Sequence, residues 1–155
     1  MISNSSTEVS LGSSPINADW ILEGNPIARN RVISRSSDSL ACTIIWDCTA
    51  GKFNWVYDID ETVHILEGSV IVSDGESPPK RLVPGSIAFF PAGTKAHWHV
   101  ENYVRKIAFC QRPLPPVLQT PISLLRQMKA LLRGQPATGS LMDQSQIVDQ
   151  SQEAA

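Results

Sequence analysis

The chain has 155 residues, a formal net charge of −2 and 18% charged side chains. This length fits one domain that can bury a core without disulfides or metals, and it leaves little room for a second catalytic domain. The weak negative charge provides no broad basic surface for a phosphate backbone, so we do not expect nucleic acid to be a partner.

The cysteines and the apolar segments bear on where the protein is found. Cys42, Cys48 and Cys110 show no Cys-x-x-Cys spacing, which disfavours a disulfide framework or a zinc knuckle and predicts buried free thiols. The N-terminus lacks the basic start and apolar segment of a secretion signal, and no apolar run reaches the roughly 20 residues of a membrane helix. We therefore expect a cytoplasmic protein without a membrane partner.

The first third of the chain leads from a polar arm into a core strand. Residues 1–14, rich in Ser and Asn, predict a flexible N-terminal arm. The apolar segment at 19–27 contains Gly-Asn-Pro and predicts an edge strand or a docked segment, followed by a turn. Residues 31–37 are polar and end in a second turn. The β-branched segment at 40–46 predicts a core strand, and residues 47–51 predict a loop after it.

The stretch at 51–68, GKFNWVYDIDETVHILEG, has the clearest pattern in the chain. Phe53, Trp55 and Tyr57 alternate with small or polar residues, which is the period of a strand. The same spacing places Trp55, Tyr57 and Glu61 on one face. An apolar segment and a Glu-Gly turn follow, so we expect a hairpin that continues into the next strand.

A second stretch at 84–98, PGSIAFFPAGTKAHW, repeats this design. It predicts a strand at 87–90, a Pro-Ala-Gly turn and a strand that contains Trp98. Further apolar segments at 97–100 and 104–109 predict two more short strands. Several short strands separated by turn residues are typical of an antiparallel sandwich or barrel rather than a parallel sheet.

The chain changes character after the predicted barrel domain, which spans 15–112. Four prolines at 113–121 predict an extended linker. Apolar residues at three-and-four spacing predict an amphipathic helix over 122–134, which is more typical of packing on protein than of a membrane anchor. Residues 135–155, rich in Gln and Ser, predict a disordered tail.

The two central stretches resemble the paired signature motifs of the cupin superfamily. FNWVYDIDETVHILEG and FPAGTKAHW are most similar to small cupins of the (S)-ureidoglycine aminohydrolase-like branch. The resemblance implies an all-β fold, a cupin-type antiparallel β-barrel also described as a double-stranded β-helix or jelly roll, to which we add the short C-terminal helix. It also implies a homodimer formed through sheet edges and exchanged N-terminal strands, a role that the apolar segment Trp20–Leu22 suits.

The resemblance also identifies four positions at which other cupins hold a metal. Metal-binding cupins supply three histidines and one glutamate, because neutral imidazoles and a carboxylate hold a divalent ion with positions open to substrate. In this sequence the four positions are Trp55, Tyr57, Glu61 and Ala96. Only the acid remains, so we expect no metal ligands and no cofactor.

Two histidines lie close to one of these positions. His97 and His99 share a strand face, but alternation places them opposite Ala96 and Trp98, which the motif directs inward. We therefore expect both imidazoles to point outward. A bulge near Thr94 would reverse this register and make a divalent metal possible again.

The predicted site is an aromatic pocket around Glu61. A carboxylate in such a pocket loses hydration, which raises its pKa unless a cation or a donor interacts with it. Lys106 or its neighbour Arg105 points inward as that partner, and alternation alone does not decide which. The rings are either walls for a ligand or simple core packing. The predicted ligand-binding residues are Trp55, Tyr57, Glu61, Phe89, Trp98 and Lys106.

Three functions are compatible with this sequence. In the first, a metal-free barrel binds a small metabolite in the aromatic pocket. In the second, Glu61 acts as a catalytic acid or base on a nitrogenous or sugar-like substrate, with or without a metal. In the third, the domain is a structural element of a dimer. The missing histidines favour binding over catalysis, and the sequence leaves the ligand open.

Overall fold

A computed structural model describes residues 9–113 and Met128. The described chain consists mainly of strands, and every strand pair is antiparallel. The predicted all-β antiparallel barrel is therefore confirmed. The elements are β1 (Gly12–Ser13), the 3-10 turn η1 (Ala18–Trp20), β2 (Ile21–Gly24), β3 (Ala28–Arg35), β4 (Ala41–Val56), β5 (Asp60–Gly68), β6 (Val70–Ser73), β7 (Lys80–Leu82), β8 (Ile87–Phe90) and β9 (Lys95–Gln111).

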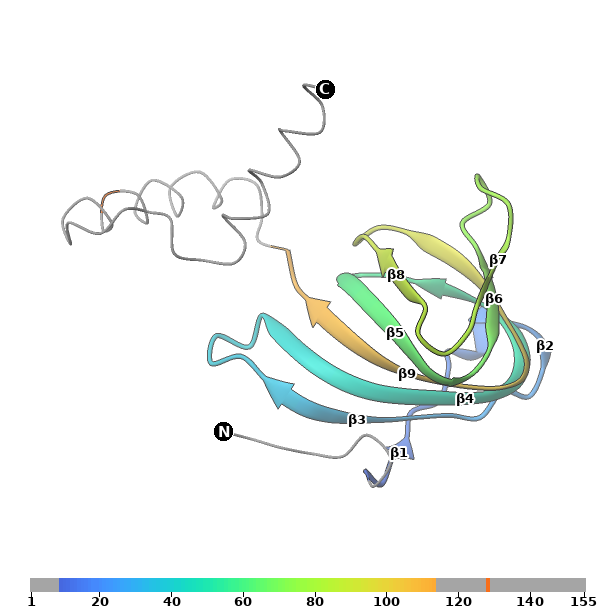
Figure 1. The fold of residues 1–155 in the computed structure, drawn as a ribbon, viewed down its shortest axis with the longest axis horizontal. Coiled ribbons are helices and arrows are strands. Elements are labelled where there is room, and N and C mark those ends of the chain that lie inside the picture. The colour runs from blue at the N-terminus through green and yellow to red at the C-terminus, as the bar shows by residue number, and fades with distance from the viewer. Residues whose placement is uncertain (1–8, 114–127, 129–155) are drawn as a thin grey trace. The chain divides into compact units, whose positions relative to one another are not determined.

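Two long strands organise the sheet. β4 and β9 pair along almost their whole lengths, from Ala41 opposite Gln111 to Val56 opposite Lys95. β3 extends the sheet beyond β4, and β5 and then β8 extend it beyond β9. Figure 1 shows β3, β4, β9 and β5 curving together, with β6 and β7 at the end of the barrel where β4 and β9 bend. The interior lies on the concave side of these strands.

The long strands bend at bulges instead of ending in loops. The pairing of β4 with β9 shifts between Thr49 and Gly51, and the pairing of β5 with β9 shifts between Ile65 and Glu67. The predicted loop at 47–51 is therefore wrong, and the two short strands predicted at 97–100 and 104–109 are parts of β9. A bulge bends a strand and increases its twist while pairing continues on both sides.

Glycines permit close backbone contacts at two of these bends. A Cβ at Gly51 would come within 2.8 Å of the Pro26 ring. A Cβ at Gly68 would come within 2.0 Å of the Tyr103 carbonyl oxygen, and Gly68 also has a φ of +70°. Only glycine fits such a position without moving the neighbouring backbone. Glu67 and Gly68 still pair with β9, and in the described chain β5 pairs with β8 and β9 but not with β6. The hairpin predicted at Glu67-Gly68 is therefore wrong, and Gly68 instead marks a bend at the end of β5.

The N-terminal region has more strand than its composition indicates. Gly12 and Ser13, which lie in the predicted flexible arm, pair with β3. β3 itself occupies the segment expected to be a polar stretch before a turn, because seven of its residues pair with β4. Tertiary pairing thus overrides weak local preference here. The turn after β3 is present, and Ser36 Oγ donates to Asp38 Oδ1 within it at 2.5 Å.

The predicted linker at 113–121, helix at 122–134 and tail at 135–155 lie outside the described residues, apart from Pro113 and Met128. They remain predictions. Within the described part of the chain, no helix has the length and apolar character needed to cross a membrane.

The barrel core is built largely from aromatic rings. Phe53 stacks on Trp98 with an interplanar angle of 14°, and Tyr57 stacks on Phe90 with ring centres 4.6 Å apart. Offset stacking and edge-to-face contacts stabilise such clusters beyond the area they bury. On β9 the side chains that point into this core are Ala96, Trp98, Val100, Val104, Lys106, Ala108 and Cys110.

Candidate functional site

A buried ion pair lies among the rings of the interior. Glu61 Oε1, at the start of β5, is 2.5 Å from Nζ of Lys106 on β9. The two residues are only 5% and 4% exposed. Lys106 Nζ also lies 4.6 Å from the centre of the Trp98 ring and 5.0 Å from that of Trp46. The ammonium group is thus held by one carboxylate and two aromatic faces.

Lys106, rather than Arg105, is the inward partner of Glu61. β9 alternates between buried and less buried residues, and Lys106 falls in the buried set with Val104 and Ala108. Arg105 falls in the other set and lies opposite Asp47 of β4. The pairing of β4 with β9 therefore decides the choice that alternation alone left open.

The bulge in β4 brings Trp46 to the site. Before the bulge, Trp46 and Cys48 are the buried inward positions; after it, Phe53 and Tyr57 are. The inward positions thus change from even to odd numbers near Gly51. Sequence reasoning placed a loop at this point and missed Trp46, although the Ala-Gly sequence in an apolar segment is a signal for a bulge.

Tyr57 is a neutral part of the core. Its hydroxyl oxygen accepts a hydrogen bond from Trp98 Nε1 at 3.1 Å. Burial, followed by the negative charge of Glu61, raises the pKa of Tyr57 far above its ordinary value. The phenol therefore keeps its proton at all ordinary pH values.

Trp55 lies at the boundary between the interior and solvent. It is partly buried and packs against the buried core. The centre of its ring lies 5.5 Å from the centre of the Trp20 ring of η1 and 6.0 Å from that of the Trp46 ring, and both contacts are edge-to-face. Trp55 and Trp20 are the partly exposed members of the ring cluster.

The predicted inward position of Phe89 is wrong. Phe89 is 59% exposed, whereas Phe90 is 8% exposed and stacks on Tyr57. Phe90 pairs with Glu61 of β5, and Phe89 pairs with Thr62. Two adjacent phenylalanines satisfy either register, so the pairing with β5 selects the inward ring.

The interior is filled by its own side chains rather than open to solvent. A ligand pocket exposes its walls when it is empty, yet each wall residue here is at most 8% exposed. Ligand entry therefore requires side chains to move. The wall residues are Trp46, Phe53, Tyr57, Glu61, Phe90, Trp98 and Lys106.

The side chains at the four cupin metal positions do not fit a divalent ion. Ala96 has no donor atom, and Trp55 and the protonated Tyr57 are poor ligands. Glu61 already holds the Lys106 ammonium group at 2.5 Å. Among residues 9–113 and Met128, no three His, Cys, Asp or Glu side chains form a group that can hold a metal.

The histidines of β9 lie on the face opposite the core. Ala96 and Trp98 are each 1% exposed, while His97 and His99 are partly exposed. The pairing of β9 with β4 is regular from Lys95 to Val100, so no bulge reverses the register there. The predicted outward direction of both imidazoles is confirmed.

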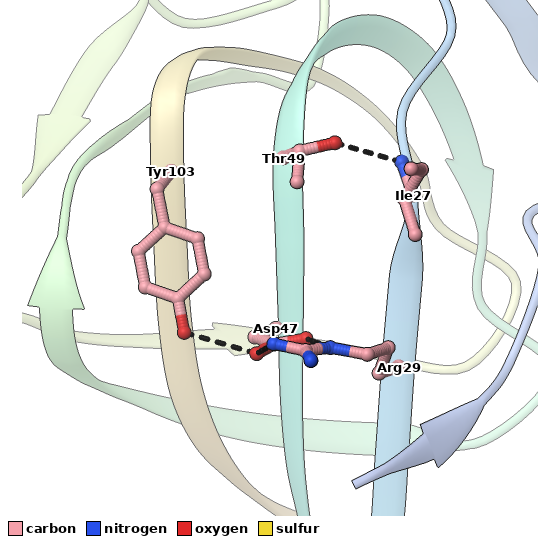
Figure 2. Close-up of polar contacts among 5 residues, drawn as sticks. All are labelled: Ile27, Arg29, Asp47, Thr49 and Tyr103. Atoms are coloured by element: carbon pink, nitrogen blue, oxygen red, sulfur yellow. Dashed lines mark hydrogen bonds and ion pairs between the residues drawn. The ribbon is translucent and has the colours of Figure 1, made fainter.

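A second buried carboxylate lies on the other face of the sheet, and sequence reasoning missed it. Asp47 of β4 is 1% exposed. Figure 2 shows its carboxylate between Arg29 of β3 and Tyr103 of β9. Arg29 donates from Nε at 3.0 Å and Nη2 at 2.6 Å, and the Tyr103 hydroxyl donates at 2.9 Å. Nearby, the Ile27 N–H donates to Thr49 Oγ1 at 2.8 Å.

The Asp47 contacts tie three neighbouring strands together. The hydrogen bonds to Asp47 raise the pKa of Arg29, and burial followed by the bond to Asp47 raises that of Tyr103. Bidentate, charge-assisted bonds of this type are among the stronger polar contacts in proteins. This cluster stabilises the sheet and contributes no side chain to the interior.

All three cysteines are free thiols. Cys48 and Cys110 are buried, as predicted, and Cys42 is half-buried. Burial, with smaller effects from Asp47 and Glu61 respectively, raises the pKa of Cys48 and of Cys110 to about 12. Both thiols are therefore protonated and poorly nucleophilic near neutral pH.

Comparisons with known proteins agree with this geometry. Residues 36–108 match the family model of the EutQ-like cupin domain. No curated protein matches the sequence. A protein of unknown function from Pseudomonas syringae is 22% identical with a TM-score of 0.62, over 67% of this chain and 45% of that one. This chain thus spans less than half of that protein.

Two further solved structures are similar at lower scores. A putative ethanolamine utilization protein from Salmonella typhimurium is 17% identical with a TM-score of 0.50, over 66% of this chain and 94% of its own. The EutQ protein of Clostridium difficile is also 17% identical with a TM-score of 0.50, over 56% of this chain and 64% of its own. These identities show the fold, and the resemblance to ureidoglycine aminohydrolase-like cupins remains a prediction. The described domain therefore has the fold of a small cupin.

Proposed function

We propose that this cupin domain binds a small molecule beside the Glu61–Lys106 pair, with Trp55 covering the entrance. The buried ion pair is the observation that carries the proposal. Taking both ions out of water costs several kcal/mol for each, and apolar side chains of similar size are often neutral or better in such a position. Recognition of a ligand explains why charges occupy an aromatic interior.

An indole N–H without an acceptor supports this interpretation. Trp46 Nε1 is buried and has no hydrogen-bond partner within the described part of the chain. The Trp46 ring also contacts the Lys106 ammonium group. A buried donor left unpaired costs about 1–3 kcal/mol, which an acceptor atom of a ligand would recover.

These groups define the chemistry of the ligand. Lys106 and Trp46 offer N–H donors, and the second oxygen of Glu61 offers an acceptor. Trp55 offers a ring face or edge at the entrance. A planar nitrogenous compound or a sugar, each of which combines polar edges with a flat apolar face, matches this set.

The alternative is an enzyme in which Glu61 exchanges a proton with the substrate. Glu61 Oε1 is already held by Lys106 Nζ at 2.5 Å, so a substrate can reach only the second oxygen of the carboxylate. The geometry therefore favours binding over catalysis. Substitution of Glu61 by Gln separates the two, because a binder keeps its affinity within a modest factor while an acid–base enzyme loses rate by roughly a hundredfold or more.

Tryptophan fluorescence provides a direct test. All four tryptophans of the chain belong to one connected cluster of rings, so intrinsic fluorescence reports on the site. We expect a screen of small metabolites to find compounds that change this fluorescence and raise the melting temperature. The Trp55→Ala variant lacks the side chain proposed to cover the entrance, so it should bind these compounds faster than the wild type.

Two matched variants locate the site. Trp46→Phe keeps a ring but removes the unpaired N–H, and we expect it to weaken binding about tenfold while the protein stays folded. Trp98→Phe removes an N–H that already donates a hydrogen bond to the Tyr57 hydroxyl oxygen, so this variant should lose more stability than ligand affinity. Equal affinity in wild type, Trp46→Phe and the double variant Glu61→Leu/Lys106→Met would refute this site.

A further inference from the structure

We propose that the outer face of β5, β8 and β9 binds a second copy of this chain. Three of its apolar side chains, Ile87, Phe89 and Phe109, are 69%, 59% and 51% exposed. Contiguous exposed apolar side chains usually mark an interaction site. We call this surface the outer patch; its members are Thr62 and His64 on β5, Ile87 and Phe89 on β8, and Ile107 and Phe109 on β9.

Strand register arranges the outer patch in two symmetric rows. In one row, Thr62 of β5 lies between Phe109 of β9 and Phe89 of β8. In the second row, His64, which is two residues further along β5, lies between Ile107 of β9 and Ile87 of β8. Residues two apart on a strand share a face, so both rows belong to one surface. Each row therefore has the same type of side chain on both sides of β5, phenylalanine in the first row and isoleucine in the second.

Such a pattern is self-complementary. An interface between two copies around a twofold axis uses the same surface on both, so its contacts occur in reciprocal pairs. When two copies of this face stack, an axis along β5 sets Phe109 against the partner's Phe89. An axis along the Thr62 row sets each phenylalanine against its own copy. In both arrangements aromatic rings meet aromatic rings.

Charge distinguishes these two arrangements. Asp60 and His64 lie on either side of Thr62 on β5, two residues away in each direction. An axis along β5 would set Asp60 against the partner's Asp60, which is unfavourable. An axis along the row sets Asp60 against the partner's His64 in two reciprocal contacts. Asp60 Oδ1 already accepts from the Ala92 N–H at 2.8 Å, and its second oxygen can accept a hydrogen bond from the imidazole. We therefore assign the axis to the Thr62 row.

The same face is hollowed and can receive side chains. A cavity of about 580 Å³ is lined by Thr62, Phe89 and Phe109 of the outer patch and continues over Thr43 of β4 and Ser34 of β3. Its lining also includes the oppositely charged Arg35 and Asp60 and the buried Cys110. Neutral hydroxyl groups next to exposed rings are compatible with burial against a similar surface. The strongly exposed Ile87 is an apolar side chain available to fill such a hollow.

The dimer contact expected from the N-terminal segment is less well supported. Trp20 packs on Trp55 of its own barrel, and Ile21 pairs with Phe53 of its own β4. Only Leu22, at 55% exposed, remains available. It therefore serves as a matched control for the outer patch.

Sedimentation velocity on the full chain tests the proposal. We expect wild type to sediment as a dimer of 17.0 kDa subunits, and Phe89→Glu/Phe109→Glu to weaken dimerisation at least a hundredfold. Leu22→Glu should leave the dimer unchanged. A wild-type monomer at about 100 μM, or a dimer that Leu22→Glu dissociates and the double variant does not, would overturn the proposal.

Crosslinking tests the same face without disturbing it. Stacked sheets lie about 10 Å apart, so Thr62→Cys should be joined to its copy by a bis-maleimide of that span. Ser77→Cys, in the β6–β7 loop, is the control and should not be crosslinked. Circular dichroism and the melting temperature establish that each variant is folded. Crosslinking of Ser77→Cys but not Thr62→Cys would place the interface elsewhere.

Discussion

Glu61 and Asp47 are both buried carboxylates, but they are neutralised in different ways. Glu61 meets the Lys106 ammonium group inside the barrel, where both residues are at most 5% exposed. Asp47 meets Arg29 on the other face of the sheet, and the Arg29 side chain is 51% exposed. Arg29 therefore keeps much of its hydration while it holds Asp47, whereas Lys106 does not.

This difference separates a structural cluster from a candidate site. Asp47 receives two bonds from a forked guanidinium group and one from Tyr103, so its oxygens are well satisfied and three strands are joined. Within residues 9–113, Glu61 receives one side-chain bond, from Lys106, whose ammonium group lies over two aromatic faces. The interior pair thus has unused hydrogen-bonding capacity, which a structural role does not require.

The largest effect should come from removing one interior charge. Lys106→Met leaves Glu61 buried without a cation, and we expect a loss of about 3–5 kcal/mol in the free energy of unfolding. Glu61→Leu/Lys106→Met should recover most of that loss, because two apolar groups need no partner. Urea unfolding measures both. A single variant that costs under about 1 kcal/mol would show that water already reaches the pair.

Asp47→Asn should have a smaller effect on stability and none on the interior. It weakens charge-assisted bonds but keeps the size of the side chain, so we expect a loss of about 2–3 kcal/mol in urea unfolding. Tryptophan fluorescence of the native state should not change. Glu101→Gln, which removes the exposed ion pair with Arg81, is the control and should leave unfolding nearly unchanged. Altered native fluorescence in Asp47→Asn would couple the two clusters.

High pH should weaken both regions through their thiols. Cys48 adjoins Asp47 and Cys110 lies opposite Glu61; burial chiefly, with these carboxylates, raises the pKa of each thiol from about 9 to about 12. The unfolded chain loses these protons first, so stability is complete below pH 9 and decreases from pH 9 toward 12. We expect the melting temperature to fall by several degrees by pH 10.5.

Cysteine variants check the origin of this pH dependence. Cys48→Ala/Cys110→Ala should reduce the decrease in melting temperature above pH 9, while its value at pH 7 falls because of the lost packing. A smaller decrease should remain above about pH 10, because the pKa values of Tyr57 and Tyr103 are also raised in the folded chain. Native thiol titration at pH 8 should modify the half-buried Cys42 first. Rapid modification of Cys110 would indicate that the interior opens far more often than its burial implies.

The smallest effect should come from Tyr103→Phe. This substitution removes one hydroxyl donor to Asp47 while the bidentate contact with Arg29 stays, so we expect a loss of about 1 kcal/mol in urea unfolding. A loss as large as that of Asp47→Asn would mean that Tyr103, rather than Arg29, is the main partner of the carboxylate.

Local patterns in the sequence carried much of the fold and the centre of the site. The strand at 87–90 and the buried positions of Tyr57 and Trp98 follow from period-two alternation and turn residues. These features depend on neighbours within a few residues, which a single sequence displays. Alternation could not locate β3, because its polar side chains are held in place by pairing with β4.

Tertiary structure decided which of several equivalent residues enters the interior. The pairing of β5 with β8 turned Phe90 inward instead of Phe89, and the pairing of β4 with β9 selected Lys106 over Arg105. The bulge near Gly51 added Trp46. Alternation specifies two faces but not which one is buried; only contacts between strands far apart in the sequence make that choice. The sequence by itself therefore determined the barrel and its inward carboxylate, whereas the packed interior around Glu61 depended on strand register.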